Sequence, residues 1–393
     1  MKKLLLATAA TALFAGAASA EDVKLGILLG FTGPLESTVP NMAKGAEIAV
    51  KEVNASGKFT LGTVTTVNGD TTCVDATAAT AAAERLVTSE GVKGIIGGDC
   101  SGVTGAVLQN VARPNGVAMI SPSATSPALS TAEDDGLFFR TAPSDARQGE
   151  VMADILSEKG VKSVAVTYTN NDYGKGLAES FAAAFTAKGG AVTVSAPHED
   201  GKADYSAEVA TLASAGGEML VVAGYVDQGG KAMIQASLDT GAFSTFYLVD
   251  GMYGESLIEA IGAPLDGSYG AVPGTDSEGS TKYQEITKAE GFEGTSAFSP
   301  ESYDAAALIM LSMAAAGSTD SKVWSTKVMD LANAPGEPIL PGELGKALEL
   351  IAAGTDIDYI GASAVELVGA GESAGNYREY KIEGGKIETV GFR

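Results

Sequence analysis

Short runs of consecutive apolar residues alternate with segments whose apolar positions recur every three or four residues. The runs are apolar on both faces, as strands buried inside a parallel sheet are. The apolar runs lie at 23–29, 94–98 and 117–121, and the mixed segment TVTTV at 63–67 occupies the corresponding place between two helical segments. The helical segments lie at about 42–54, 76–90 and 101–113. This βαβαβα order with short loops predicts a parallel sheet that is covered by helices on both faces.

A loop-rich stretch at 122–146 interrupts the series, which then starts again with the same layout. The second series has helical segments at about 147–159, 175–188, 204–215 and 228–239. This repetition predicts an α/β protein with two similar Rossmann-like lobes. After a further break near 272–274, Ser299 followed by Pro300 predicts an N-cap and a long apolar helix that ends near Ala316. The last residues predict an antiparallel hairpin.

The first 20 residues have the three parts of a secretory signal peptide. Two lysines precede an apolar stretch, which ends at the small residues before Glu21. We expect cleavage after Ala20 and a periplasmic mature protein. No lipid anchor is expected, because no cysteine follows the cleavage site. No second stretch reaches the ~18 uninterrupted apolar residues of a membrane span. At about 150 residues per domain, the rest of the chain predicts two domains.

Charge and rare residues narrow the function further. The chain has 26 Lys+Arg against 49 Asp+Glu, a formal net charge of −23. This excess of acid excludes a nucleic-acid partner, which requires a basic surface, and argues against docking on anionic lipid. One histidine and two cysteines exclude sites that need several imidazoles or thiolates, so we expect neither a metal nor a cofactor. In an oxidising compartment, the two cysteines favour one disulfide over two free thiols.

One segment matches a catalytic sequence motif but lacks the structural context that the motif requires. Residues 371–375, GESAG, match G-x-S-x-G, the nucleophile elbow of serine hydrolases. The elbow requires a strand before it, a helix after it and a histidine later in the chain. Here a predicted hairpin follows, and His198, the only histidine, lies upstream in an acidic segment that indicates a surface residue. We therefore predict no enzyme, with an exported serine hydrolase as the remote alternative.

Polar and aromatic residues gather in six loops that follow predicted strands. In open α/β sheets, ligands bind beyond the carboxyl ends of the strands. Hydroxyls and backbone N–H groups can hold a carboxylate, an acid can hold an ammonium, and aromatic rings can cover an apolar group. The loops therefore suit a small zwitterion. The candidate residues are Asp99, Ser101, Ser123, Thr125, Tyr173, Tyr225 and Asp250.

Each candidate also has a purely structural explanation. Helix capping alone explains Ser101 equally well, and turn formation between two prolines explains Ser123 and Thr125 equally well. A tyrosine before a glycine, as at Tyr173, is more often a half-buried packing residue. Asp250 could be a cap or a turn residue. The prediction therefore depends on six loops that coincide with six strand ends.

The order of these segments resembles the periplasmic binding proteins for leucine, isoleucine and valine, which are type I solute receptors of ABC transporters. The resemblance covers essentially the whole mature chain. Its most specific parts are CS at 100–101, SPSATSP at 121–127, YGKGLA at 173–178 and ESYDAAA at 301–307. It implies a two-lobed receptor that clamps a small solute in the cleft and delivers it to permease subunits in the inner membrane. We expect a monomer.

The resemblance also assigns individual segments and residues. It implies three crossings between lobes, so that lobe 1 comprises 21–142 and 273–368 and lobe 2 comprises 143–272 and 369–393. It implies a disulfide between Cys73 and Cys100. It places the amino-acid contacts at Ser101, Ser123 (through its backbone) and Thr125 in lobe 1, and at Tyr173, Tyr225 and Asp250 in lobe 2.

Three positions depart from the family pattern. Asp250 replaces the more common glutamate as the ammonium acceptor, and Thr38 stands where an aromatic residue is often found. Asp99 stands where receptors for branched-chain ligands usually have an apolar residue, and a charge that faces an isopropyl group would be unfavourable. We therefore predict an amino acid, branched-chain or related, as the ligand. An aromatic acid, amide or amine bound by the same fold is the alternative.

Overall fold

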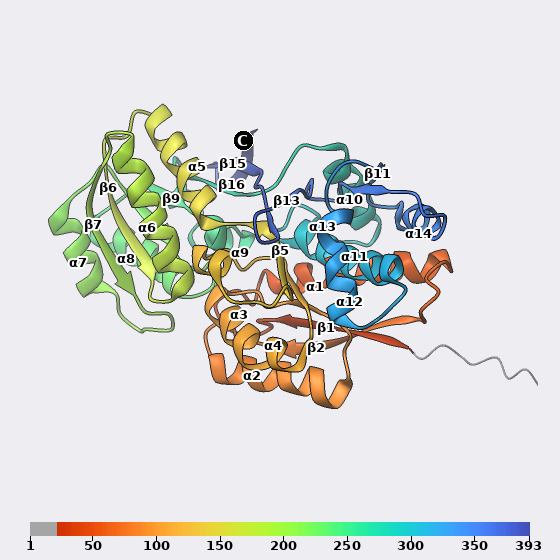
Figure 1. The fold of residues 1–393 in the computed structure, drawn as a ribbon. Coiled ribbons are helices and arrows are strands. Elements are labelled where there is room, and N and C mark those ends of the chain that lie inside the picture. Colours follow the sequence, from red (N-terminus) through yellow and green to blue (C-terminus); the bar gives the residue numbers. More distant parts are fainter. Residues whose placement is uncertain (1–21) are drawn as a thin grey trace, which may run out of the picture.

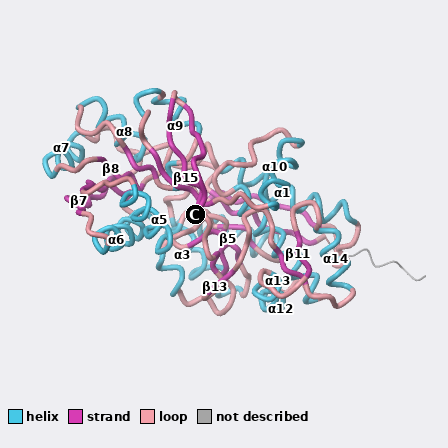
Figure 2. Tube along the Cα trace, turned by 90° about the horizontal axis from the view of Figure 1, so that it is seen from above, coloured by secondary structure: helices cyan, strands magenta, loops and turns pink. Residues whose placement is uncertain are grey.

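The computed structural model describes residues 22–393, so the predicted signal peptide lies outside the described residues. Two lobes lie side by side, and each is built around one seven-stranded sheet (Figure 1). Seen from above, the C-terminus lies at the junction of the two lobes (Figure 2). In this part of the chain, no helix has both the length and the apolar composition of a membrane span.

The first lobe contains the sheet with strand order β13-β14-β5-β4-β3-β1-β2, in which β1 to β5 run parallel. Its strands are β1 (Val23–Leu29), β2 (Val64–Asp70), β3 (Ile95–Gly97), β4 (Met119–Ser121), β5 (Phe138–Pro143), β13 (Leu367–Val368) and β14 (Glu372–Ser373). Its main helices are α1 (Val39–Ser56), α2 (Ala76–Glu84), α3 (Ser101–Val107) and α11 (Ser299–Ala316). Helix α1 packs against α11, and α2 packs against α3. Residues such as Leu25 and Ile96 are fully buried, as the apolar runs predict.

The second lobe repeats this plan with strand order β16-β15-β10-β9-β8-β6-β7. Its strands are β6 (Ser163–Thr169), β7 (Ala191–His198), β8 (Met219–Ala223), β9 (Phe246–Leu248), β10 (Tyr269–Pro273), β15 (Tyr377–Glu383) and β16 (Lys386–Phe392). Its helices are α5 (Asp145–Glu158), α6 (Asp172–Ala187), α7 (Ser206–Ala215), α8 (Gly229–Thr240) and α9 (Glu255–Ile261). The predicted hairpin is confirmed as β15 and β16. Its turn uses Gly384 and Gly385, both at positive φ, which suits a two-residue hairpin loop.

Shorter elements complete the chain. They are α4 (Arg113–Asn115), α10 (Glu278–Ala289), α12 (Ser321–Trp324), α13 (Val328–Leu331), α14 (Leu344–Ala352), β11 (Glu337–Ile339) and β12 (Ile357–Tyr359). The predicted helices at 76–90 and 101–113 each change to a wider π-helical turn, at Arg85–Glu90 and at Leu108–Ala112. Periodicity of apolar residues does not distinguish these turns from α-helix.

The chain passes between the two sheets after β5, after β10 and again before β15. The predicted change of lobe at 368/369 comes too early, because β14 still pairs with β5 of the first sheet. The third passage therefore lies between Ser373 and Tyr377. A two-residue strand has no apolar run, so the sequence pattern could not show it.

The start of α11 also differs from the prediction. Phe298 occupies the N-cap position with a φ of 59°, and Ser299 is the first helical residue. The Ser299 hydroxyl donates to the carbonyl of Asn41 at 2.9 Å and shares a hydrogen bond with the hydroxyl of Tyr283 at 2.6 Å. Tertiary partners therefore take the hydroxyl that the sequence pattern assigned to capping.

Candidate ligand-binding site

A cavity of about 20 Å³ lies between the lobes. Its lining residues are Leu35, Asp99, Cys100, Ser101, Ser123 and Phe298 from the first lobe, and Tyr173, Tyr225, Asp250 and Gly251 from the second. It brings together every predicted contact residue except Thr125, which is held beside it by Ser101. This volume holds about one water molecule, so a ligand the size of an amino acid requires the lobes to separate.

Ser101 anchors the neighbouring loop and does not cap its own helix. It is the first residue of α3, directly after the loop that follows β3. Its Oγ accepts hydrogen bonds from the backbone N–H groups of Thr125 at 3.2 Å and Ser126 at 3.0 Å. With the lone pairs of Ser101 engaged in this way, its hydroxyl hydrogen remains available to donate to a ligand.

The loop after β4 is fixed by several further hydrogen bonds. The Ser121 hydroxyl donates to the carbonyl of Gly98 at 2.6 Å, and the Ser123 hydroxyl donates to the carbonyl of Asp99 at 3.0 Å. The buried Arg140 donates to the carbonyls of Ala124 and Ser126 at 3.0 and 2.9 Å. The loop is therefore rigid before any ligand arrives.

The disulfide between Cys73 and Cys100 is confirmed. It joins the loop after β2 to the residue directly before α3. Asp99 lies beside it, and both of its carboxylate oxygens are engaged, by the backbone N–H of Gly30 at 2.8 Å and by the hydroxyl of Thr71 at 2.7 Å. Burial raises the pKa of Asp99, and these two hydrogen bonds oppose the rise. Asp99 therefore lines the cavity, and the hydrogen bonds to its carboxylate connect the loops after β1, β2 and β3.

The second lobe presents two stacked aromatic rings and an acid. Tyr173 and Tyr225 stack with centroids 5.1 Å apart and ring planes inclined by 19°. The Tyr173 hydroxyl donates to Oδ1 of Asp250 at 2.5 Å, and the backbone N–H of Gly251 donates to the same oxygen at 2.8 Å. Burial raises the pKa of Asp250, and the hydrogen bond from Tyr173 opposes the rise. A side chain at Gly251 would collide with the Gly224 carbonyl and the Tyr173 hydroxyl, so this close approach requires glycine.

Two apolar lining residues were missed by the sequence reasoning. Leu35 belongs to the first of the six loops, and the sequence comparison with the family pattern had singled out the nearby Thr38 instead. Thr38 instead lines a separate groove of about 420 Å³ between the lobes. Phe298 lies directly before the Ser-Pro start of α11, and that position was the only signal for it.

The lobes are also hydrogen-bonded to each other beside the cavity. Asp227 of the second lobe accepts from the backbone N–H of Ser37 in the first lobe at 2.9 Å. The N–H of Asp227 donates to the carbonyl of Pro34 at 3.1 Å, and the other oxygen of its carboxylate accepts from Ser256 at 2.8 Å. The two contacts with Ser37 and Pro34 join the lobes in a closed arrangement, and Ser256 of the second lobe orients the Asp227 carboxylate.

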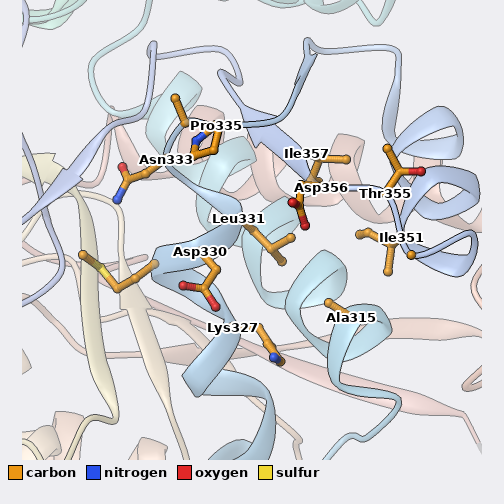
Figure 3. Close-up of a pocket in the computed structure, with 13 residues that line it drawn as sticks. Ala315, Lys327, Asp330, Leu331, Asn333, Pro335, Ile351, Thr355, Asp356 and Ile357 are labelled. Atoms are coloured by element: carbon orange, nitrogen blue, oxygen red, sulfur yellow. The ribbon is translucent and has the colours of Figure 1, made fainter.

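A larger cavity of about 570 Å³ lies elsewhere, in the C-terminal part of the first lobe around α13 and β12 (Figure 3). Lys327, Asp330 and Asp356 are among the side chains around it. It does not lie at the carboxyl ends of the parallel strands, and only one lobe contributes to it. The interlobe cavity is therefore the better candidate for a ligand.

The hydrolase motif does not form a nucleophile elbow. Ser373 ends the short strand β14, and the hairpin strand β15 follows it in place of a helix. The expectation that His198 is a surface residue is wrong, because it is 1% exposed at the end of β7 in the other lobe. Its Nδ1 shares a hydrogen bond with the Thr167 hydroxyl at 2.8 Å, and burial lowers its pKa from 6.5 to about 4. The acidic neighbours in the sequence concealed a buried, neutral imidazole.

Comparison with known proteins agrees with this architecture. The sequence profile of a family described as periplasmic binding protein matches residues 22–329. The chain is 34% identical over 352 residues to the Leu/Ile/Val-binding protein homolog 3 of Brucella melitensis, which covers 85% of this chain and 89% of that protein.

Two solved structures have the same fold. The branched-chain amino acid transporter substrate binding protein LivJ from Streptococcus pneumoniae, in complex with isoleucine, has a TM-score of 0.76 at 22% identity, covering 94% of this chain and 99% of that chain. A solute binding protein of an ABC transporter from R. palustris, in complex with 4-hydroxybenzoate, has a TM-score of 0.75 at 16% identity, covering 95% and 97%. The chain therefore belongs to the type I periplasmic binding proteins of the Leu/Ile/Val-binding family, which are non-enzymatic, extracytoplasmic solute receptors of ABC transporters.

Proposed function

We propose that this receptor binds an amino acid, branched-chain or related, in the interlobe cavity and delivers it to an ABC importer. The observation that carries the proposal is the arrangement of opposite chemistries on the two lobes. Ser101 supplies a donor from the first lobe, and the buried acid Asp250 comes from the second. A zwitterion between the lobes would engage both.

The binding mode follows from the contacts at the cavity. The hydroxyls of Ser101 and Thr125, with the backbone of Ser123, would hold the ligand carboxylate, and Asp250 would hold its ammonium group. The Tyr173 and Tyr225 rings would cover the apolar part of the ligand, together with Leu35 and Phe298. Because ligand contacts are split between lobes, the ligand would favour the closed state over the open one.

We further propose the processing and organisation of the chain. The signal peptide is removed after Ala20, and the mature protein acts in the periplasm as a monomer. Residues 21–142 and 273–373 form one lobe, and residues 143–272 and 374–393 form the other. The last boundary follows the sheet to which β14 belongs, and the first two lie at the final residues of β5 and β10.

An aromatic acid is the second candidate. The stacked Tyr173 and Tyr225 rings could cover an aromatic ligand, and the similar protein from R. palustris was solved with 4-hydroxybenzoate. The buried Asp250 opposes this candidate, because a benzoate has no cation to pair with it.

A thermal-shift panel separates the two candidates. The panel contains the twenty common amino acids, 4-hydroxybenzoate, benzoate and benzamide. A ligand at 1,000 times its Kd adds about 4 kcal/mol to the stability of the native state, which produces a clear rise in melting temperature. We expect the rise with one or a few amino acids. A rise with an aromatic acid and with no amino acid would refute the amino-acid proposal.

A further inference from the structure

A buried arginine at the junction of the two lobes has no acidic partner. Arg378 is the second residue of β15 and is 8% exposed. Within residues 22–393 it is the exception among six arginines, because the other five each form a salt bridge, namely Arg85, Arg113, Arg140, Arg147 and Arg393. In a chain with 49 acidic and 26 basic residues, a buried cation without a counter-charge requires an explanation.

The guanidinium of Arg378 has donors that no acceptor of the protein uses. Its Nη2 donates to the carbonyl of Thr295, in the loop before α11, at 2.8 Å. Its central carbon lies 4.8 Å from the ring centroid of Tyr253. Its Nε is buried and has no hydrogen-bond partner within residues 22–393. Because a guanidinium carries five N–H donors in a planar fork and buried donors are normally paired, we expect an acceptor that is not part of the chain.

A buried acid near Arg378 does not neutralise it. Glu301 lies on the first turn of α11 and is 2% exposed, and in the described part of the chain it forms no hydrogen bond through Oε2 and no salt bridge with Arg378. Burial raises the pKa of Glu301 to about 8, and the positive charge of Arg378 is among the influences that lower it. Glu301 therefore keeps its proton for the most part at neutral pH, and Arg378 keeps its charge without a counter-charge.

Two cavities meet at Arg378. One is the interlobe groove of about 420 Å³ described above, and the other has a volume of about 250 Å³. Both are lined by Arg378, Thr295, Ser296 and Thr389. We call the smaller one the junction cavity, because Pro273 and Gly274 at the second crossing between lobes also line it. It shares no lining residue with the candidate amino-acid site.

The charges around the two cavities differ. Glu255 and Glu293 line the groove together with Arg378, so the groove opposes an anion. Among the described residues around the junction cavity, Arg378 alone is charged. The hydroxyl oxygens of Ser280 and Ser296 in this cavity each accept a hydrogen bond from a side-chain amide, at 3.1 and 2.8 Å, so their hydrogens remain free to donate. The junction cavity therefore offers one positive charge and neutral donors.

The shape of the junction cavity suits a small molecule with a short apolar part. Its apolar lining includes Pro300 at the start of α11 and Phe392 at the end of β16. A water molecule takes up about 30 Å³ of the liquid, so a cavity of about 250 Å³ holds an organic molecule of a few heavy atoms. Arg378 belongs to the second lobe and Ser296 directly precedes the start of α11 in the first, so such a molecule would contact both lobes.

We propose that the junction cavity is a second ligand site, which binds a small monocarboxylate through the guanidinium of Arg378. The planar fork of arginine matches the two oxygens of a carboxylate, and the single positive charge suits a single negative one. The inference goes beyond the proposed function, because it concerns a different cavity and a ligand that needs no ammonium group.

The first experiment observes Arg378 directly. The ¹⁵Nε–Hε signals of ¹⁵N-arginine-labelled protein are recorded, and the Arg378 signal is identified by its loss in Arg378→Lys or Arg378→Gln. Sodium propionate is exchanged for sodium chloride at constant ionic strength, so that general screening does not change. We expect a saturable shift of the Arg378 signal, and no shift for Arg85, which pairs with Glu90. Propionamide, which has the same shape without the charge, should shift neither.

The second experiment compares propionate affinity between variants, followed at the backbone N–H signals of Ser296 and Thr389. Arg378→Lys keeps the positive charge and loses the fork, so affinity should fall roughly 10- to 150-fold, the range of one charged hydrogen bond. Arg85→Lys makes the same exchange at a surface salt bridge and is the matched control, which should bind propionate as the wild type does.

The wild-type titration decides the proposal even if a variant at Arg378 does not fold stably. No shift of any arginine signal with propionate, equal shifts of all of them, or an equal response to propionamide would overturn the proposal and leave Arg378 as a structural contact between the lobes. Equal propionate affinity of Arg378→Lys and the wild type would also overturn it. None of these results bears on amino-acid binding at Asp250, so the two proposals fail separately.

Discussion

The two lobes contribute to the candidate site in different ways. In the first lobe, two polar side chains at the site are already bonded to the protein: Ser101 accepts hydrogen bonds from two backbone N–H groups, and Asp99 accepts from Gly30 and Thr71. In the second lobe, the buried acid Asp250 accepts from the Tyr173 hydroxyl and from the backbone N–H of Gly251 at the same carboxylate oxygen, Oδ1. The first lobe therefore holds these two side chains in fixed positions, and we call it the platform, whereas the second lobe contributes the buried acid Asp250.

This difference indicates that the two lobes have different roles in stability and in binding. Removing a polar side chain from the platform leaves buried protein donors unpaired, so it should destabilise the fold as well as weaken binding. Removing an acid from the opposite wall takes away a charge that is costly to bury in the free protein, so it should affect binding far more than folding. The predictions below test this contrast, beginning with the largest effect.

The largest effect is expected for Asp250→Ala. Truncating one partner of a buried charge pair costs about 2–5 kcal/mol, so affinity for an amino acid should fall roughly 30-fold to several thousand-fold. Melting of the ligand-free protein should change less than binding, because Asp250 has no cationic partner to lose, and only the Tyr173 hydroxyl and the Gly251 N–H lose their acceptor. Calorimetry and thermal denaturation on the same sample measure both quantities. A large loss of stability without loss of binding would reverse the proposed roles of the lobes.

The disulfide gives the next largest effect. The bond between Cys73 and Cys100 spans 27 residues, for which the chain-entropy model gives about 3–4 kcal/mol of stability. The double variant Cys73→Ser with Cys100→Ser should therefore unfold at clearly lower denaturant concentration. Because the bond fixes the start of α3, the folded variant should also bind more weakly. Unchanged stability would show that the platform does not depend on the bond.

His198 should make the second lobe sensitive to acid. Its pKa is about 4 in the folded protein, against 6.5 ordinarily, so the unfolded chain takes up a proton at a pH where the folded chain does not. Stability is therefore full above pH 6.5 and falls by about 3 kcal/mol as the pH falls to 4. His198→Gln should remove this part of the pH dependence in urea unfolding curves. The same slope in wild type and variant would contradict this assignment.

A smaller effect on stability is expected for Ser101→Ala, which tests the platform directly. The change leaves the N–H groups of Thr125 and Ser126 without their acceptor, and an unsatisfied buried donor costs about 1–3 kcal/mol. Both melting temperature and affinity should fall, in contrast to Asp250→Ala. A fall in affinity alone would mean that Ser101 is a ligand contact only.

The sequence predicted the architecture well, because each buried parallel strand is a short apolar run between amphipathic helices. It also predicted which loops meet, since the carboxyl ends of parallel strands lie along one edge of a sheet. It could not show β14, a two-residue strand, or the burial of His198, because both depend on contacts far away in the chain.

Asp99 shows why the sequence alone does not predict the role of every site residue. From the sequence, Asp99 was expected to place a charge at the apolar end of the ligand. In the structure, both of its carboxylate oxygens instead accept hydrogen bonds from the protein. Asp99→Leu should therefore cost stability through Gly30 and Thr71 before it changes ligand preference. A sequence gives the type of a side chain but not the direction in which its polar atoms point.

The most direct test of the account is a calorimetric comparison of three ligands that share one skeleton: L-leucine, 4-methylpentanoate, which lacks the amine, and isopentylamine, which lacks the carboxylate. The account predicts that wild-type protein binds leucine much more tightly than either truncated ligand. It also predicts that Asp250→Ala no longer distinguishes leucine from 4-methylpentanoate, because the ammonium has lost its partner. Equal affinity of wild-type protein for leucine and 4-methylpentanoate would contradict it. If the panel selects another amino acid, that amino acid and its analogues without the amine or the carboxylate replace the three ligands.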